Sequence, residues 1–383
     1  MFSDNNIYLK RSCLSLIVPF VFEGFGKIQS LDLSVNNLTI LYSKSFYGMI
    51  NLKKLYLSFN QISQIELDVF QDLIKLDLLD LNDNLIRHLN VNLFDNLHEL
   101  EYIDLSSNQI EYLEENTFKN FLSLEILILK NNKLKSLECI FHNLSSFNFL
   151  DVSYNAITYV HNNTFKTLNK IEKIHIFNNL ISEINAETFK GAENLEILQI
   201  YNNRLKSIHI NFSVNFPNLK ELSMTNNNLS LIDADFFKDF VKLEILGLGN
   251  CSITNINLNS LSNLKYLNLG KNQITFFSQN LTSLETFLMN SNPLYNLSYP
   301  LITSQNSRLA YLDLSYCFLT FIDMNILKAF TNLKKLKLLG FHFTLNNQSF
   351  EGFTKLREVY LSENYSGLFS NLSSNISFYY SKN

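Results

Sequence analysis

The chain has 383 residues, a formal net charge of −4 at pH 7 and only 17% charged residues. This weak acidity would not attract nucleic acid or an anionic membrane surface, so neither is expected as a partner. The four cysteines do not cluster, and no apolar run approaches the length of a membrane span. The composition therefore predicts no disulfide framework and no membrane segment in this chain.

The first element expected in chain order is a repeat unit at the N-terminus. Lys10 and Arg11 followed by the apolar run 13–22 are also typical of a secretory signal. We favour the repeat, because Ser12 lies 24 residues before Asn36 and the apolar residues of the run fit the spacing of the later units. The chain then begins inside one repeat and ends inside another without terminal caps, which indicates a piece of a longer protein. The alternative is an uncapped protein that is stabilised by self-association.

The strongest signal is an asparagine that recurs with a period of 24 residues, with a single step of 23. A fixed period of this length predicts a solenoid, in which each unit buries its apolar face by stacking on the next. The regular positions of this asparagine ladder are Asn36, Asn60, Asn84, Asn108, Asn132, Asn155, Asn179, Asn203 and Asn227.

The residues around each asparagine predict a short buried strand followed by a turn. Alternating leucines such as Leu55 and Leu57 have the period of a strand with one buried face. The asparagine follows where the chain leaves the strand, and its amide can both donate and accept to satisfy buried turn backbone. Ten residues after each asparagine a second buried column is expected, made of Phe46, Phe70, Phe94, Phe118, Phe165, Phe189 and Phe237.

Read from Leu52, this pattern is Leu52-x-x-Leu55-x-Leu57-x-x-Asn60, and almost the whole chain repeats it. It resembles the leucine-rich repeat family, in particular its "typical" 24-residue subfamily. The resemblance implies an α/β solenoid: a curved horseshoe with a parallel sheet on the concave face and loops or 3₁₀ turns on the convex face. We expect a single solenoid over 1–383 with about 15–16 repeats, regular to about residue 250 and irregular over 251–383.

In the irregular part, other residues replace some asparagines of the ladder. Asn272 and Asn292 keep the amide, while Cys251 and Cys317 could act as weak donors in its place. Phe341 could not, so its turn is expected to be distorted or hydrated. The stretch Tyr299–Arg308 is expected to protrude as a loop. Asn364 is expected to be a buried ladder position, after which 368–383 has no clear repeat pattern.

A group of apolar and aromatic residues is expected on the concave face, where most repeats have Asp and Ser. An exposed patch of this kind with a polar rim suggests a protein interface. The alternative is drift, since exposed strand positions accept such residues on propensity alone. Phe177 and Tyr201 are expected to be exposed. The patch comprises Ile128, Lys130, Tyr154, His175, Phe177, Gln199 and Tyr201.

Charged side chains form two further groups. Asp32, Asp80, Asp104, Asp151 and Asp313 occupy one strand position and are interpreted as local hydrogen-bond acceptors, with an acidic stripe for a basic partner as the alternative. Near the C-terminus we expect a solvated basic surface, with an anionic glycan or nucleic-acid contact as the alternative. This basic group comprises Lys334, Lys335, Lys337, Lys355 and Arg357.

The sequence gives no sign of catalysis, a metal site or a cofactor. It has no Gly-rich phosphate loop and no HExxH or GxSxG motif, and its seven histidines fall at several different repeat positions. We therefore expect a non-enzymatic module.

The resemblance implies a ligand-recognition module that binds a protein ligand or co-receptor, like the ectodomains of Toll-like receptors, chaoptin-like adhesion proteins and Slit-like secreted proteins. The expected setting is extracellular or at the cell surface, as part of a longer signalling receptor, with glycosylation at Asn211, Asn228 and Asn280. One alternative is an adhesion or matrix protein that forms homodimers. Others are the ligand-binding region of a receptor enzyme whose catalytic domain lies outside this chain, and a cytoplasmic scaffold.

Overall fold

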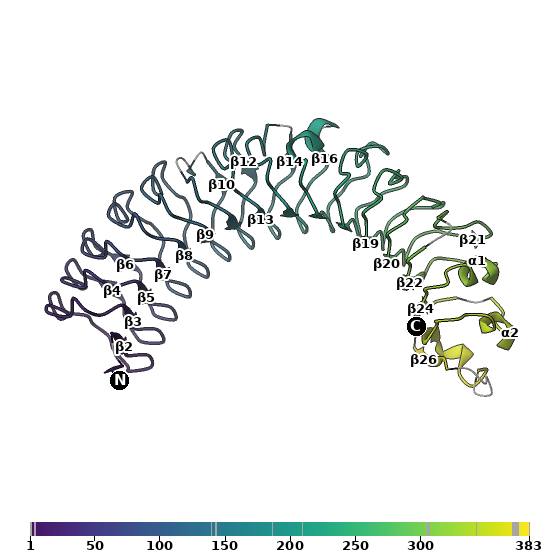
Figure 1. The fold of residues 1–383 in the computed structure, drawn as a ribbon, viewed down its shortest axis with the longest axis horizontal. Helices are drawn as coiled ribbons and strands as arrows, with labels where there is room; N and C mark the ends of the chain where they lie inside the picture. Colours follow the sequence, from purple (N-terminus) through teal and green to yellow (C-terminus); the bar gives the residue numbers. More distant parts are fainter. Residues whose placement is uncertain are drawn as a thin grey trace. The chain divides into compact units, whose positions relative to one another are not determined.

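The fold is a solenoid of short parallel strands with little helix (Figure 1). A computed structural model describes residues 2–3, 5–138, 140–141, 144–185, 187–208, 210–304, 307–341, 343–369 and 375–382. The chain divides into two compact units, Met1–Leu198 and Gln199–Asn383, which are described in turn.

In the first unit each repeat contributes one strand to a parallel sheet. Equivalent residues lie opposite one another, so that Leu31 is paired with Leu55, and Leu55 with Leu79. In Figure 1 these strands follow the inner side of the curve, and loops form its outer side. The strands are β2 (Asn6–Tyr8), β3 (Ser30–Asp32), β5 (Lys54–Tyr56), β7 (Leu78–Asp80), β8 (Tyr102–Asp104), β9 (Ile126–Ile128), β11 (Phe149–Asp151), β13 (Lys173–His175) and β15 (Ile197–Gln199), the last of which crosses the unit boundary.

Shorter strands accompany them. β1 (Phe2–Ser3) pairs antiparallel with β2. On the outer side, β4 (Ile40–Leu41) pairs with β6 (Gln64–Ile65), and β10 (Ser136–Leu137) with β12 (Tyr159–Val160), both in parallel. β14 (Glu183–Ile184) occupies the corresponding place in a later repeat.

The ladder asparagines connect adjacent repeats through buried backbone. The Asn84 amide Nδ2 donates to the Leu81 carbonyl in its own repeat (3.0 Å) and to the Leu57 carbonyl in the preceding one (3.0 Å). Its Oδ1 accepts from the Ile62 amide (2.9 Å). The same pattern recurs at Asn36, Asn60, Asn108, Asn132, Asn155 and Asn179. One side chain per repeat thus satisfies turn backbone that water cannot reach.

The predicted second column is present as a series of buried phenylalanines. The rings of Phe46 and Phe70 stack with centroids 6.2 Å apart, as do those of Phe70 and Phe94. Phe165 and Phe189 stack at 5.2 Å. All five rings are at most 2% exposed, so the column forms the outer half of the core.

The N-terminal run belongs to the repeat pattern only in part. β2 pairs with β3, and Ile17 and Phe22 are buried in the stack. Val18 and Phe20 are exposed, so the repeat does not account for every apolar residue of the run.

The second unit contains the remaining strands and all the helical turns of the described residues. Its inner strands pair in parallel from β17 to β26. They are β17 (Glu221–Ser223), β18 (Ile245–Gly247), β19 (Tyr266–Asn268), β20 (Thr286–Leu288), β22 (Tyr311–Asp313), β24 (Lys335–Leu338), β25 (Glu358–Ser362) and β26 (Ser377–Ser381). Its other elements are β16 (Ser207–Ile208), η1 (Ile210–Asn215), β21 (Asn296–Leu297), β23 (Phe321–Ile322), α1 (Met324–Lys328), α2 (Asn347–Phe350) and η2 (Glu363–Tyr365).

The ladder continues here with substitutes. Asn203, Asn227, Asn272 and Asn292 donate to carbonyls of their own turns. The Cys251 thiol donates to the Met224 carbonyl (3.3 Å), and Cys317 donates to Met289 (3.1 Å), as expected for weak donors in place of the amide. At Phe341 serine hydroxyls serve the backbone, because Ser362 Oγ accepts from the Gly340 amide at 2.7 Å.

Three expectations for this unit are wrong. The stretch Tyr299–Arg308 does not simply protrude, because Leu301 is fully buried and Ile302 bridges in parallel to Gln279. Asn364 is exposed in η2, since Ser362 takes the buried acceptor position. The C-terminal segment continues the sheet as β26, in which Phe378 and Tyr380 lie opposite Val359 and Leu361 of β25.

Candidate surface on the sheet face

Four aromatic side chains meet on the solvent-facing side of strands β11 and β13 and on the turns that follow these strands. Phe149 and His175 lie edge to face with centroids 4.9 Å apart, and Tyr154 meets Phe177 in the same way at 5.5 Å. His175 and Phe177 are 5.9 Å apart, which joins the two pairs. We call Phe149, Tyr154, His175 and Phe177 the aromatic cluster.

Tyr154 is the most exposed member of the cluster, with 48% of its surface accessible. Its backbone lies in the left-handed region at φ 55°. The residue before a ladder position adopts this conformation throughout. It is asparagine, which tolerates it, at 131, 178, 202, 226 and 250, and a bulkier residue at other positions such as Val35, Phe59 and Tyr316. A tyrosine there is strained by about 1 kcal/mol. Lys130 lies over the Tyr154 ring at 5.4 Å and places a cation at the edge of the cluster.

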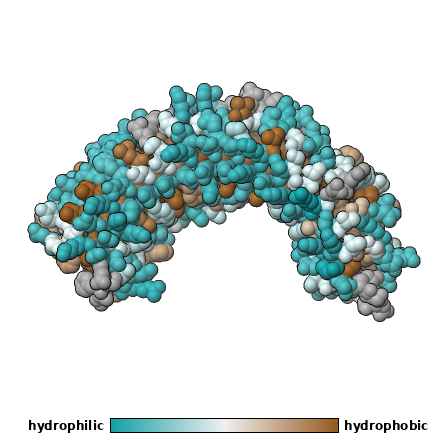
Figure 2. Space-filling model, in the orientation of Figure 1, coloured by the Kyte–Doolittle hydropathy of each residue, from teal (hydrophilic) through white to brown (hydrophobic). Residues whose placement is uncertain are grey.

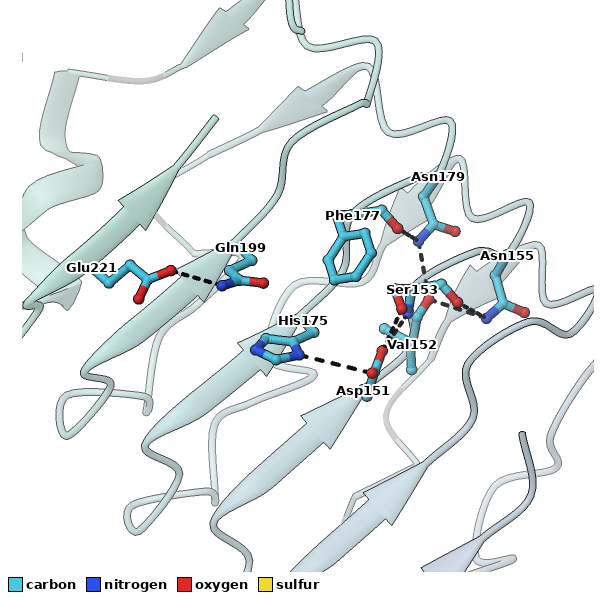
Figure 3. A network of polar contacts seen from close by, with 9 residues as sticks. All are labelled: Asp151, Val152, Ser153, Asn155, His175, Phe177, Asn179, Gln199 and Glu221. Carbon is cyan, nitrogen blue, oxygen red and sulfur yellow. Dashed lines mark hydrogen bonds and ion pairs between the residues drawn. The ribbon is translucent and has the colours of Figure 1, made fainter. Parts of the chain in front are cut away.

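Phe177 is not exposed as predicted, because only 8% of its surface is accessible. Its ring packs against those of Tyr154 and His175, and Figure 3 shows His175 beside it. Phe177 is therefore the buried member of the cluster, on which the more exposed rings pack. Ile128 and His175 are half-buried, while Lys130 is exposed.

A polar network lies beside the aromatic rings. His175 Nδ1 is 3.8 Å from Asp151 Oδ2, and the other oxygen of Asp151 accepts from the Ser153 amide (2.9 Å) and hydroxyl (2.6 Å) (Figure 3). Burial raises the pKa of Asp151, but the nearby His175 and the hydrogen bonds from Ser153 outweigh it and lower the pKa below its usual value. Asp151 is thus a charged group that orients His175.

The other aspartates of the series mainly make local contacts. Asp32 and Asp313 each accept from the backbone amide of the serine two residues later. The local interpretation of the series is supported, although Asp313 also lies 4.0 Å from Lys337 on the neighbouring strand, and Asp151 also reaches His175. Sequence reasoning missed that link, although Asp151 and His175 occupy the same register position in β11 and β13.

The two predicted patch residues of the second unit are polar and half-buried. Gln199 Nε2 donates to Glu221 Oε1 at 2.7 Å, so its side chain is held by a contact within the unit (Figure 3). Tyr201 precedes the ladder residue Asn203 and is also half-buried. On the side of the molecule shown in Figure 2, hydrophobic residues form small separate groups in a hydrophilic surface.

The predicted glycosylation positions are partly accessible. Asn228 and Asn280 are exposed in the second unit. Asn211 lies outside the residues whose side chains the structure describes. Among the described residues no group of three or more His, Cys, Asp or Glu side chains could hold a metal ion. Within the same residues, no helix has the length and apolarity needed to cross a membrane.

The family model described as leucine rich repeat matches residues 5–62, 50–110, 103–157, 148–205, 169–229 and 193–253. No curated protein matches the chain in sequence. Among solved structures, a leucine-rich repeat protein of Leptospira interrogans is similar with a TM-score of 0.84 and 22% identity, over 98% of this chain and 95% of its own.

Two receptor structures are also similar. The TLR13–ssRNA13 complex matches with a TM-score of 0.71 and 20% identity, over 96% of this chain and 52% of its own. The Toll–Spatzle complex of Drosophila matches with a TM-score of 0.67 and 23% identity, over 92% of this chain and 51% of its own. This chain spans about half the length of those two chains, and at these identities the likeness shows the fold alone.

Proposed function

Because this chain belongs to the leucine-rich repeat family, we propose that it is a non-enzymatic recognition module that binds a protein partner through the aromatic cluster. Proteins of this family are generally binding modules. The cluster offers a partner one exposed tyrosine, a cation at its edge and a histidine held by a carboxylate. Tyrosine anchors surrounded by packed side chains are the usual centres of protein interfaces.

The observation that supports this proposal best is that neighbouring side chains hold the exposed Tyr154 ring in place. The left-handed backbone at this position costs a tyrosine stability that asparagine, present at five equivalent positions, does not lose, and Val35, Phe59 and Tyr316 share this conformation. The contacts of the Tyr154 ring with Phe177 and Lys130 offset that cost and hold the ring in one orientation. A ring that is fixed before binding loses less conformational entropy when a partner covers it.

We also propose that the module belongs to a cell-surface or secreted receptor. Exposed sequons at Asn228 and Asn280 favour this setting. Toll, which is in complex with Spatzle in the structure named above, is a precedent for a protein ligand on this fold. Mass measurement of the chain secreted from animal cells tests it: glycan at Asn228 and Asn280 is expected, and their absence would argue for a cytoplasmic scaffold.

The partner-binding proposal is tested with Tyr154→Asn and a matched control, Phe59→Asn. Phe59 has the same left-handed backbone (φ 54°) and is 54% exposed, but it lies outside the cluster. Immobilised chains of each variant and of the wild type are exposed to secreted and cell-surface proteins, and each captured protein is then purified and its affinity measured.

A partner of this site is expected to bind the wild type and Phe59→Asn equally and Tyr154→Asn about tenfold or more weakly. If every captured protein binds all three chains with the same affinity, the cluster is not the recognition site. Concentration-dependent dimers that Tyr154→Asn abolishes would identify the partner as a second copy of the chain.

A further inference from the structure

A second surface, which shares no residue with the aromatic cluster, lies on the solvent-facing side of the C-terminal strands of the second unit. Tyr311 of β22 is paired with Lys335 of β24, and Lys337 with Tyr360 of β25. Tyr360 is in turn paired with Tyr379 of β26. We call Tyr311, Lys335, Lys337, Tyr360 and Tyr379 the tyrosine–lysine face.

The rings fix the two ammonium groups in place. Lys335 Nζ lies 4.7 Å from the centroid of Tyr360 and 5.4 Å from that of Tyr311. Lys337 Nζ lies 5.3 Å and 5.7 Å from the same two rings. Contact with two aromatic faces holds each cation without neutralising it.

The third ring provides an apolar platform beside these cations. Tyr379 stacks on Tyr360 with centroids 4.7 Å apart and planes 18° from parallel. It is 46% exposed, so much of its surface is open to a ligand. Aromatic rings with one packed and one open face are common anchors for apolar side chains at interfaces.

The charge of this surface differs in sign from that of the whole chain. Lys335 pairs with Glu358 at 3.1 Å, and Lys337 lies 4.0 Å from Asp313. Lys334, Lys355 and Arg357 lie at the start of the same strands and are exposed. Five cationic side chains against two carboxylates give a local excess of positive charge in a chain whose net charge is −4. Such a surface attracts an acidic partner.

We propose that the tyrosine–lysine face binds an acidic peptide segment of a protein partner, whose carboxylates pair with Lys335 and Lys337 while an aromatic or apolar side chain packs on Tyr379. Glu358 and Asp313 lie inside the face, where they would oppose the continuous phosphates of a nucleic acid but leave room for separate carboxylates. The inference does not depend on partner binding by the aromatic cluster, because the two surfaces lie in different units.

The probe for the test is a short synthetic peptide that alternates glutamate and tyrosine, labelled for fluorescence anisotropy with the full chain. Wild type is compared with Lys335→Ala/Lys337→Ala, and with Lys238→Ala/Lys242→Ala as a control of equal charge change at exposed lysines of the same unit. We expect about tenfold weaker binding for the first pair and little change for the control. Tyr379→Ala should weaken binding by a similar factor.

For one further variant, the geometry predicts a gain in peptide affinity and not a loss. Glu358→Gln removes the carboxylate that competes for Lys335 and should tighten peptide binding about threefold. Circular dichroism of each variant confirms the fold, and Lys335→Gln/Lys337→Gln replaces the alanine pair if that pair unfolds.

Three results would overturn the proposal. They are equal weakening by both lysine pairs, equal binding of a peptide with lysine in place of glutamate, and tighter binding of a single-stranded oligothymidylate at the same salt concentration. The last would assign the face to nucleic acid. Tyr154→Asn should leave peptide binding unchanged, so failure here and failure of the aromatic cluster are distinguishable.

Discussion

Removal of one ladder asparagine should loosen two repeats at once, and Asn132→Ala is the sharpest case. Asn132 Nδ2 donates to the carbonyls of Leu129 (3.1 Å) and Leu105 (2.9 Å), while its Oδ1 accepts from the Ile110 amide (2.9 Å). Each carbonyl keeps a second donor, because Asn155 also donates to Leu129 and Asn108 to Leu105. The Ile110 amide has no other hydrogen-bond acceptor among the bonds of the described residues.

The free-energy cost of Asn132→Ala follows from the hydrogen bonds that it removes. A buried amide without an acceptor costs about 1–3 kcal/mol, and the loss of one of two donors at each carbonyl adds about 0.5 kcal/mol each. The free energy of local opening at Ile110 should therefore fall by about 3 kcal/mol, which speeds hydrogen exchange of its amide about a hundredfold.

The matched control is Asn131→Gly, one residue away. Asn131 is exposed, its side chain donates to Ser107 Oγ (3.2 Å), and its φ of 56° is one that glycine adopts freely. It should change exchange at Ile110 by less than about threefold. Equal effects of the two variants at Ile110 would refute the assignment of the ladder as the link between repeats.

Three other predictions follow from burial and charge. Phe177→Asp should destabilise the fold by about 3 kcal/mol or more in urea unfolding, because it buries a carboxylate among aromatic rings. A change below about 1 kcal/mol would show that the side chain at position 177 is exposed, as the sequence had predicted. Since the pKa of Asp151 is lowered from 3.8, its contribution to stability should be complete above that pH and be lost as the pH falls further. In urea unfolding at a series of pH values, Asp151→Asn should lose less stability than wild type on acidification. An equal loss in both proteins would contradict this prediction. Burial raises the pKa of Cys251 from 9.0 to about 11 and that of Cys317 to about 12, so native protein at pH 8 should react with iodoacetamide at Cys13 and not at these two thiols. The stability that the two buried thiols contribute should be lost as the pH rises from about 9 through 11. Labelling of Cys251 at the rate of Cys13 would show that Cys251 is not buried.

The fold follows from sequence because its register is set by one residue type with one function. Only an amide can donate to two carbonyls and accept from a third group at each buried turn, so Asn60 or Asn84 marks its repeat without ambiguity. The phenylalanine column follows for a similar reason, since Phe46 and Phe70 fill equivalent spaces in equal repeats.

The surface was harder to predict, because side-chain direction at a turn depends on the neighbouring repeat. Phe177 follows β13, whose outward residues Lys173 and His175 are exposed and half-buried, yet its own ring is buried against Tyr154 of the adjacent turn. The tyrosine–lysine face was recognised only as a basic group, since Tyr360 and Tyr379 are 19 residues apart and break the period that would align them. Their contact depends on β26, which has Phe378 and Tyr380 opposite Val359 and Leu361 of the preceding strand and so lacks the usual aliphatic pattern.

Site-specific photo-crosslinking tests most directly whether Tyr154 is the centre of a protein-binding surface, as we propose. A photoreactive phenylalanine is placed at position 154 or, as control, at position 59, which has the same backbone conformation and similar exposure. The claim predicts that position 154 crosslinks a protein that position 59 does not, and that this protein binds purified Tyr154→Asn about tenfold or more weakly than wild type. The same crosslinked proteins at both positions, or equal affinity for both purified chains, would contradict it.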